Sequence, residues 1–320
     1  MSKLRTAISL LANCEFTRFH SRLRFNLCKL RLAYARRSPF IYRLTGIPFV
    51  CNPGIPDSEE YYLTGAIDHI ELKVLWRWLQ AGDIFIDIGA NLGIYTFAAV
   101  HFLRGRGTVF AIEAAPELVT NLQKSADMLG AHNLNLIQCV VGDANKESVF
   151  YTAPLGQSTG EQSLCPDPAR STDYMPRRLK MRTLSDIATE YPAFASPAAV
   201  KIDIEGAEVM ALSAVPPTWF SATGPLWIVE INPSALVRIG TSCAALVRYF
   251  HGNIFECWLL PHFALTGERI LPPRPLMAEE KFTDAWFYNL IAVPVNTNQS
   301  SRYKRINPVL SAAQHTSTSS

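Results

Sequence analysis

The sequence of 320 residues lacks several features that would assign it to a special class of protein. Its seven cysteines, an odd number, contain no Cys-x-x-Cys pair and no zinc-type spacing. No stretch reaches the roughly 18 to 20 consecutive apolar residues that a membrane-spanning helix needs. The apolar run at residues 7–12 is too short for a secretory signal. We therefore expect a cytoplasmic protein with reduced thiols that does not span a membrane.

The chain as a whole also lacks an excess of charge of one sign. Thirty Lys and Arg residues stand against 27 Asp and Glu, a formal net charge of +3. This balance fits neither a strongly basic nucleic-acid binder nor an acidic disordered chain. With 48% hydrophobic residues, a chain of this length buries a full core. The composition predicts one large domain, or a domain with an appendage.

Basic residues gather at the start of the chain. Residues 1–46 contain ten Lys and Arg against one acid, Glu15, which gives +9, whereas the rest has 20 against 26 acids, which gives −6. Apolar residues recur there at spacings of mostly three and four, which predicts a cationic amphipathic helix. They are Ile8, Leu11, Phe16, Phe19, Leu23, Leu27, Leu30 and Tyr34.

Three interpretations of this basic segment remain open. The favoured one is that the apolar stripe of the helix packs on the main domain or on a second subunit. The second is peripheral contact of residues 1–46 with an anionic membrane, where basic residues add electrostatic attraction. The third is a transit peptide, which is typically rich in Arg and poor in acids.

Residues 47–295 alternate strand and helix patterns. Short apolar runs at 84–88, 108–112, 134–141, 198–204 and 226–231 are mostly separated by helical stretches such as 116–129 and 207–214. This alternation predicts an α/β, Rossmann-like fold with an open, mostly parallel sheet and helices on both faces. Such sheets bind ligands at the carboxyl ends of their strands. Residues 296–320 turn polar and predict a mobile tail.

The loop after the first of these strands has the composition of a ligand-binding turn. Gly89 and Gly93 allow a tight turn and close approach of a ligand, and Asn91 tolerates positive φ. The helix that follows offers free N–H donors. A dinucleotide fingerprint needs Gly-x-Gly-x-x-Gly, which Asn91 and Ile94 break, so NAD and FAD are disfavoured.

Acidic residues around this loop point to a different cofactor. Asp87 stands on the strand two residues before Gly89, where it can face a ligand ammonium. Glu113 ends the next strand, where an acid can accept both hydroxyls of a ribose. Asp143 closes the third strand, near the expected adenine, although Gly-Asp is also an ordinary turn. A ligand with an ammonium, a carboxylate and a ribose but no pyrophosphate matches S-adenosylmethionine.

The fourth predicted strand carries a second group of charges. Because side chains alternate along a strand, Lys201, Asp203 and Glu205 share one face. Charges in a buried parallel sheet are costly unless they are paired or line a site. A structural ion pair is a serious alternative for Lys201, whereas Asp203 and Glu205 favour a cleft. Glu230 and Asn232 end the next strand and can complete the cleft wall.

Together these segments resemble the FkbM family of S-adenosylmethionine-dependent methyltransferases. The resemblance rests on residues 85–96 (FIDIGANLGIYT), 201–208 (KIDIEGAE) and 289–294 (NLIAVP), in the expected order. It implies a class I methyltransferase fold with seven strands, of which 255–260 and 287–293 form an antiparallel pair. It also implies O-methylation of a hydroxyl on a sugar, glycolipid or polyketide-like small molecule.

The resemblance also implies roles for individual residues. The residues implied to hold the cofactor are Asp87, Gly89, Asn91, Gly93 and Glu113. Asp203 and Glu205 are implied to lie beside the methyl group. An alcohol must lose its proton as it accepts the methyl group, and we nominate Asp203 as the base, with Glu205 or Glu230 assisting. Tyr61, Tyr62 and Tyr95 are candidate aromatics of the cleft, and the insert at 150–182 is expected to shape the acceptor pocket.

Several alternatives remain beside this hypothesis. A metal-assisted version would use Asp203, Glu230 and Asn232 as ligands of a divalent cation, although no dense Asp cluster marks a cage. Methylation of RNA is disfavoured because residues 47–320 are acidic, although the basic segment keeps it open. The hypothesis from another class is a cofactor-binding or membrane-tethered interaction protein without activity.

Overall fold

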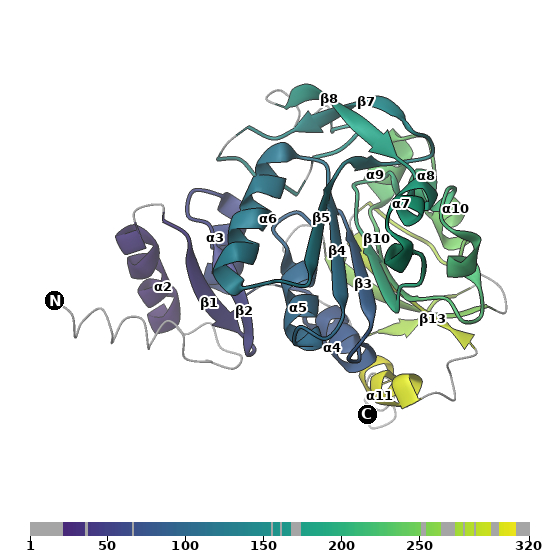
Figure 1. Cartoon of the computed structure of the whole chain (residues 1–320), viewed down its shortest axis with the longest axis horizontal. Helices are drawn as coiled ribbons and strands as arrows, with labels where there is room; N and C mark the ends of the chain where they lie inside the picture. The colour runs from purple at the N-terminus through teal and green to yellow at the C-terminus, as the bar shows by residue number, and fades with distance from the viewer. Residues whose placement is uncertain are drawn as a thin grey trace.

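An eight-stranded sheet runs through the centre of the molecule (Figure 1). The computed structural model describes residues 22–35, 38–65, 67–154, 156–160, 162–167, 174–250, 254–263, 273–277, 279–284, 286–295 and 301–311. The strands of this sheet are β3 (Ile84–Ile88), β4 (Thr108–Glu113), β5 (Leu134–Gln138), β9 (Ala199–Ile202), β10 (Leu226–Ile231), β11 (Phe255–Phe263), β12 (Arg274–Pro275) and β13 (Trp286–Pro294). Their order is β12-β11-β13-β10-β9-β3-β4-β5.

The sheet is mostly parallel, as the alternation of strands and helices predicts. β10, β9, β3, β4 and β5 are parallel, and β13 pairs antiparallel with both β10 and β11. The expected antiparallel pair is therefore confirmed as β11 and β13. The expected number of seven strands is wrong, because the two-residue strand β12 adds an eighth at the edge beside β11. Pro275 fits an edge position since it has no N–H to donate.

Helices cover both faces of the sheet. On one face pack α4 (His69–Trp78) and α5 (Ile94–Leu103), and on the other pack α7 (Leu184–Glu190), α8 (Glu208–Leu212), α9 (Pro233–Arg238) and α10 (Cys243–Val247). α6 (Pro116–Leu129) places Leu122 in the core under α5. Neighbouring strand residues alternate between the two cores: Phe85 faces α5, whereas Ile86 and Ile88 face the other layer. This two-sided burial explains the nearly continuous apolar runs of the central strands.

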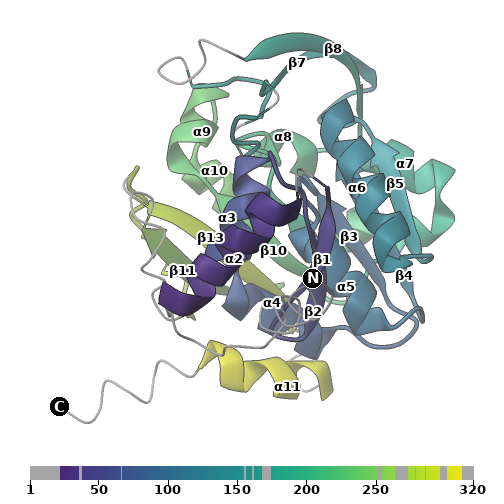
Figure 2. The same ribbon diagram turned by 90° about the vertical axis from the view of Figure 1, so that its left-hand side faces the viewer.

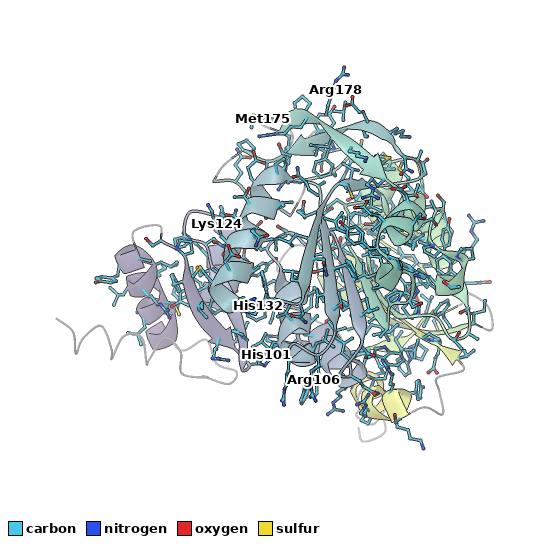
Figure 3. The ribbon with its side chains drawn as sticks, in the orientation of Figure 1. His101, Arg106, Lys124, His132, Met175 and Arg178 are labelled. Carbon is cyan, nitrogen blue, oxygen red and sulfur yellow. The ribbon has the colours of Figure 1, made fainter. Side chains whose placement is uncertain are left out.

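A small sheet caps the carboxyl ends of the parallel strands. It consists of β6 (Val140–Val141), β7 (Lys146–Thr152) and β8 (Met175–Arg182), in the order β6-β8-β7. Met175 and Arg178 of β8 lie at the top in Figure 3, whereas His101 and Arg106 lie at the opposite end, where β4 begins. Two 3-10 helices, Pro192–Ala195 and Pro217–Phe220, complete the other connections.

The N-terminal elements form a flank beside the main sheet. They are α2 (Arg22–Ala35), β1 (Phe40–Leu44), β2 (Ile47–Cys51) and α3 (Pro56–Thr64), seen at the left of Figure 1. β1 and β2 form a hairpin whose turn, Thr45-Gly46, has positive φ at both residues. The predicted domain boundary after residue 46 falls between this turn and β2 and stays a prediction. None of the helices in the described parts of the chain combines the length and apolar composition that a membrane crossing requires.

The prediction that the apolar stripe of the basic helix packs on the main domain is wrong, whereas its packing on a second subunit stays a prediction. In α2 the buried side is formed by Cys28, which is 1% exposed, and by Leu32, which packs on the core. The predicted apolar stripe faces outward instead, since Leu30 and Tyr34 are each 58% exposed. The earlier part of the predicted stripe, including Ile8 and Phe19, lies outside the described residues.

The predicted mobile tail is wrong for residues 301–311. Ser301–Leu310 forms helix α11, which packs against α4 at the bottom of Figure 1. Ile306 and Leu310 are both 0% exposed, and Arg302 forms a bidentate ion pair with Asp83 at 2.7 and 2.8 Å. The buried apolar residues Ile306, Val309 and Leu310 lie on one side of this polar helix and dock it. The prediction failed because it used the polar composition of the whole segment.

Candidate active site

A cleft lies where the parallel strands end, beneath the small sheet. Its empty volume is ≈ 870 Å³, including the part open to solvent. Residues after β3, β4, β5 and β9, together with Glu230 near the end of β10, form its floor and walls, as expected for an open α/β sheet. The residues that line it are Tyr61, Gly89, Asn91, Ile112, Glu113, Ala114, Leu118, Cys139, Val140, Val141, Phe150, Thr159, Gly160, Gln162, Leu164, Asp203, Ile204, Glu205, Ala207 and Glu230.

The loop from β3 to α5 forms one wall of the cleft and depends on its glycines. Gly89 and Gly93 have φ of 80° and 83°, and Asn91 has φ of 47°, so all three lie in the left-handed region. A Cβ at Gly89 would collide with the backbone carbonyl of Asp203. A Cβ at Gly93 would collide with the Phe97 ring. The turn predicted from the sequence is therefore present, with Gly89 and Asn91 on the cleft and Gly93 beneath it.

Glu113, at the end of β4, braces this loop. One carboxylate oxygen accepts a hydrogen bond from the Asn91 N–H at 2.8 Å, and the other accepts one from the Ala115 N–H at 2.9 Å. Burial raises the pKa of Glu113, and these two N–H donors oppose that rise. Each oxygen has a second lone pair, so the carboxylate can still accept bonds from a ligand that enters the cleft.

Asp87 is not among the residues that line the cleft. Its side chain is 1% exposed and accepts a hydrogen bond from the Thr96 hydroxyl at 2.6 Å. Lys201 is its Cα partner on the neighbouring strand β9. Burial raises the pKa of Asp87 to about 6, although Lys201 and Thr96 oppose the rise. A direct contact between Asp87 and a ligand ammonium stays a prediction.

Asp143 also lies outside the residues that line the cleft. Its carboxylate pairs with Lys146 at 3.3 Å, and both side chains are about half exposed. Val141, two residues earlier, does line the cleft. A contact between Asp143 and an adenine ring therefore stays a prediction.

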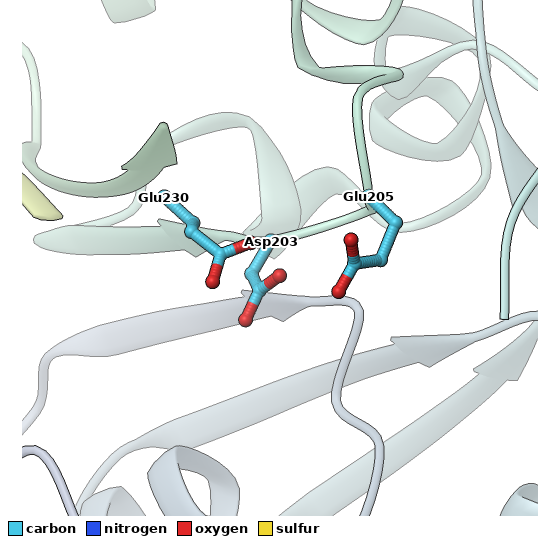
Figure 4. A group of neighbouring side chains, drawn as sticks. All are labelled: Asp203, Glu205 and Glu230. Atoms are coloured by element: carbon cyan, nitrogen blue, oxygen red, sulfur yellow. The ribbon is translucent and has the colours of Figure 1, made fainter. Parts of the chain in front are cut away.

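Three carboxylates meet at the other wall of the cleft (Figure 4). Asp203 follows β9, Glu205 lies two residues later, and Glu230 is in β10. One oxygen from each lies within 4.8 Å of the others, and Asp203 lies between the two glutamates in Figure 4. The structure thus brings together the three residues nominated for catalysis, because β9 and β10 are parallel neighbours that end at the same edge.

The three carboxylates do not share one protonation state. Burial, together with the negative charges of Asp203 and Glu205, raises the pKa of Glu230 well above its usual value. Burial also opposes ionisation of Asp203, but Lys201 at 2.8 Å and a hydrogen bond from Glu230 outweigh it and lower the pKa of Asp203. The raised pKa favours the protonated form of Glu230, and the lowered pKa favours the ionised form of Asp203.

Glu205 is held in a strained backbone conformation. Its φ of 52° lies in the left-handed region, which non-glycine residues rarely adopt. Gly206, with φ of 101°, continues the turn and leaves no room for a Cβ beside the Ala235 backbone. Asn232 donates a hydrogen bond to the Glu205 carboxylate at 3.1 Å. Such strain is characteristic of functional sites, where it fixes a side chain in one direction.

Asn232 does not occupy the position that the metal-assisted alternative requires. Its side-chain oxygen caps α9 by accepting hydrogen bonds from the Ala235 N–H and the Ser234 hydroxyl. Its amide nitrogen is the group that faces Glu205. Asn232 therefore orients Glu205 instead of offering an oxygen to a cation.

Sequence reasoning missed the function of Glu208. This buried carboxylate accepts hydrogen bonds from the backbone N–H of Ile204 at 2.9 Å and of Gly206 at 3.3 Å. Burial raises its pKa to about 7, against the effect of these bonds. Glu208 thus fixes the loop that carries Glu205. An acid in the first turn of a helix, directly after a glycine turn, is the sequence signal that indicates this function.

Sequence reasoning also missed Asp57, which ties a loop over the cleft. Asp57 of α3 accepts hydrogen bonds from the Ser158 hydroxyl and from the N–H of Thr159. The Thr159 hydroxyl lies 2.8 Å from Asp57 and 2.7 Å from the Asn91 side chain. The expected contribution of the insert is thus made by its residues Thr159, Gly160, Gln162 and Leu164, which line the cleft.

The three candidate aromatics have different positions. Tyr61 lines the cleft. Tyr62, its neighbour in α3, is 1% exposed and packs against Phe40 and Tyr42 of β1. Tyr95 is buried, donates a hydrogen bond to Asp68 at 2.7 Å and lies with its ring 5.1 Å from the Lys201 ammonium. Only Tyr61 among them can contact a ligand in the cleft.

Comparisons with known proteins assign this architecture to a family. Residues 87–257, more than half of the chain, match the model of the methyltransferase FkbM domain. A protein-L-isoaspartate O-methyltransferase of Fervidobacterium nodosum is 32% identical over 114 residues, 35% of this chain and 51% of that protein. The chain thus spans about half the length of this curated relative.

Two solved structures illustrate the structural comparison. A methyltransferase FkbM from Methylobacillus flagellatus has 13% identity and a TM-score of 0.37, covering 91% of this chain and 59% of that one. A SAM-dependent methyltransferase from Agrobacterium tumefaciens has 8% identity and a TM-score of 0.39, covering 79% of this chain and 69% of that one.

Proposed function

Because the chain belongs to the FkbM family of methyltransferases, whose cofactor is S-adenosylmethionine, we propose that it methylates a hydroxyl oxygen. The acceptor that we propose is a sugar, a glycolipid or a polyketide-like small molecule. The observation that carries the proposal is the cluster of Asp203, Glu205 and Glu230, which lines the same cleft as the glycine loop. The name of the curated relative, an O-methyltransferase, also supports oxygen as the acceptor atom.

The cleft has the features that S-adenosylmethionine requires. Gly89 and Gly93 keep the loop after β3 close to the sheet, where an L side chain would collide with neighbouring atoms. Glu113 lies on the lining at the end of β4 and can accept hydrogen bonds from ribose hydroxyls. Apolar side chains of the same lining can pack on an adenine ring, namely Ile112, Leu118, Val140 and Phe150. We propose that these groups hold the cofactor.

The proposed chemistry uses one ionised and one protonated carboxyl group. When bound, the cofactor supplies a methyl group activated by its positively charged sulfur. Asp203 is ionised at neutral pH and can accept the proton of an acceptor hydroxyl as that oxygen is methylated. Glu230 lies beside Asp203, and its raised pKa favours a protonated carboxyl that can donate a hydrogen bond to Asp203. Glu205, fixed by Asn232, can orient the acceptor in line for transfer.

The experiment that tests the proposal is calorimetric titration of the full chain with S-adenosylmethionine and S-adenosylhomocysteine, followed by transfer of labelled methyl groups to a panel of glycans and polyketide-like alcohols. We expect micromolar affinity, about −8 kcal/mol, and label in an ether linkage. Transfer that disappears with EDTA and returns with a divalent cation would favour the metal-assisted alternative. A folded protein that binds neither ligand would favour an interaction protein without activity.

The location that we propose is the cytoplasm. The six cysteines that the described residues include are free thiols, and Cys28, Cys51 and Cys139 are buried. Free thiols are typical of a reducing compartment.

A further inference from the structure

Helix α2 has an apolar side that the fold leaves exposed. Leu27, Leu30 and Tyr34 follow one another at spacings of three and four and so lie on one side of the helix. Leu30 and Tyr34 are each 58% exposed. The helix is attached to the domain by another side, which carries Cys28 and Leu32. Large apolar side chains at this exposure are costly in water unless a partner covers them.

The same helix carries positive charge and no acid. Its sequence, RLRFNLCKLRLAYA, contains three arginines and one lysine. Lys29 is exposed and lies over the ring of Phe25, with its ammonium 4.5 Å from the ring centre, and Phe25 is itself 37% exposed. Beside the helix, Arg43 of β1 is also exposed. Residues 1–46 as a whole carry +9. The charge therefore selects an anionic partner.

We infer that α2 lies on the surface of an anionic phospholipid membrane. Leu30 and Tyr34 enter the boundary between head groups and acyl chains, and the basic residues contact lipid phosphates. Exposed apolar side chains beside Lys and Arg are the combination that holds a helix in a membrane interface. Each basic residue near an anionic bilayer adds electrostatic attraction, which falls off within a Debye length.

Helix α3 connects this surface with the active-site cleft. α2 packs on α3, with Arg31 placed 6.0 Å from the centre of the Tyr62 ring (Figure 2). Tyr61, the preceding residue, lines the cleft, and Asp57 of the same helix holds the loop with Thr159 over it. Both α2 itself and α3 therefore lie between the exposed side of α2 and the cleft, and an α-helix with side chains is about 10 Å across.

This geometry specifies the acceptor class further. A protein attached through α2 works at a lipid surface, where head-group hydroxyls and lipid-linked sugars are the acceptors at high local concentration. Among the acceptors proposed above, the glycolipid is therefore the one that the surface favours. This step rests on the proposed methyl transfer, whereas attachment of α2 to the membrane does not.

The test is co-sedimentation of the full chain with vesicles of phosphatidylcholine, with and without phosphatidylserine. We expect binding to the anionic vesicles that weakens as salt rises. The variant L30E/Y34E should reduce this binding about tenfold or more, because it removes the inserted side chains and adds repulsion. K29E should weaken it by a smaller factor. The matched control is Val237→Glu, since Val237 is 67% exposed on α9.

Two outcomes would overturn the inference. One is equal vesicle binding by the full chain and by L30E/Y34E, with unchanged circular dichroism showing that the variant is folded. The other is a dimer in analytical ultracentrifugation that L30E/Y34E dissociates, without vesicle binding by the unmodified chain, which would assign the surface to a second copy. Calorimetry with S-adenosylmethionine is run on the same samples. Loss of cofactor binding there would contradict the proposed methyl transfer and leave the vesicle result intact.

Discussion

The ammonium of Lys201 lies 2.8 Å from the carboxylate of Asp203, two residues along the same side of the chain. The Lys201 side chain is 9% exposed and that of Asp203 is 31% exposed, so the ammonium is withdrawn from water while the carboxylate still reaches the cleft. Asp87 is the Cα partner of Lys201 on the neighbouring strand β3. One buried cation thus faces two carboxylates, of which Asp203 has a lowered pKa and Asp87 a pKa raised to about 6. The sequence analysis treats a structural ion pair and a position in the cleft as alternatives. The structure combines them, because Asp203 pairs with Lys201 and also lines the cleft.

Asp203→Asn should abolish most of the methyl transfer and leave the cofactor bound. Removal of a general base typically costs 10² to 10⁴ in turnover, roughly, and the amide keeps the size of the side chain. Turnover with labelled methyl groups and calorimetric affinity for S-adenosylmethionine measure the two effects separately.

The control for this variant is Asp127→Asn, because Asp127 is exposed on α6 and far along the helix from the cleft loop. Unchanged turnover in Asp203→Asn would remove Asp203 as the base.

Replacing Glu230 with glutamine should favour stability more at pH 8 than at pH 5. The quantity compared is the free energy of unfolding of the variant minus that of the unmodified chain. The folded pKa of Glu230 is raised, so the folded state keeps a proton that the unfolded state loses as pH rises above about 4.5. Stability from this group is therefore complete at low pH and is lost as pH rises towards the folded pKa. The amide keeps the size of the side chain and does not titrate, so the stability of the variant should not show this loss as pH rises.

Urea unfolding of both proteins at the two pH values measures this difference. If the difference in free energy of unfolding between the two proteins is the same at pH 5 and at pH 8, the pKa of Glu230 is not raised in the folded state.

Glu205→Gly should stabilise the fold and weaken catalysis. Glycine adopts the φ of 52° without the steric cost that Glu205 bears, which is about 1 kcal/mol. The same change removes the carboxylate that Asn232 orients towards the cleft. Thermal or urea unfolding should show the gain, and turnover should show the loss.

Glu205→Gln separates the two effects, since it keeps the backbone strain and removes the charge. If Glu205→Gly is less stable than Glu205→Gln, the relief of backbone strain is smaller than the unfolded-chain entropy that glycine adds.

Asp57→Ala should loosen the loop over the cleft. The carboxylate accepts hydrogen bonds from Ser158 and Thr159, so its removal frees both groups. We expect faster amide hydrogen exchange in residues 156–160 and weaker binding of the cofactor or acceptor by about tenfold, equivalent to 1.4 kcal/mol. Glu60→Gln, exposed on the same helix, is the matched control. Equal exchange rates in the two variants would contradict a fastening function of Asp57.

Leu310→Ala should destabilise the whole domain. Leu310 is 0% exposed between α11 and the core, and truncation of a buried leucine costs about 2 to 5 kcal/mol. Lys304→Ala, at an exposed position of the same helix, should change the free energy of unfolding by less than about 0.5 kcal/mol. Equal stabilities of the two variants, measured by urea unfolding, would mean that α11 is not docked in solution.

The sequence predicts the sheet and the cleft well because their signals are local. The apolar runs of the central strands, the turn from Gly89 to Gly93, and acids at strand ends lie within a few residues of one another. In a parallel sheet, local position also fixes spatial position, because strands end at one edge. That is why Glu113 and Asp203 could be assigned to one cleft from their places in the chain.

The errors arise where contacts are distant in sequence. The bond between Asp57 and Thr159 joins residues 102 positions apart, and nothing near either one indicates the other. Helix α11 docks through Ile306 and Leu310 on a helix more than 200 residues earlier. For α2, periodicity identified an apolar side correctly, but the domain packs against Cys28 on another side. Periodicity shows that a helix has an apolar side and does not say which partner covers it.

Because Gly89 has no side chain, the loop after β3 and the loop after β9 lie in direct backbone contact. The carbonyl of Asp203 occupies the space that a Cβ at Gly89 would need. The Asp203 N–H donates a hydrogen bond to the Ile88 carbonyl at 3.0 Å. The wall that we assign to the cofactor and the proposed base are therefore in backbone contact. Position 89 thus couples the two walls, because its φ of 80° and its contact with the Asp203 carbonyl leave no room for a side chain. A substitution at this glycine would therefore displace the backbone that carries the proposed base as well as the loop that we assign to the cofactor.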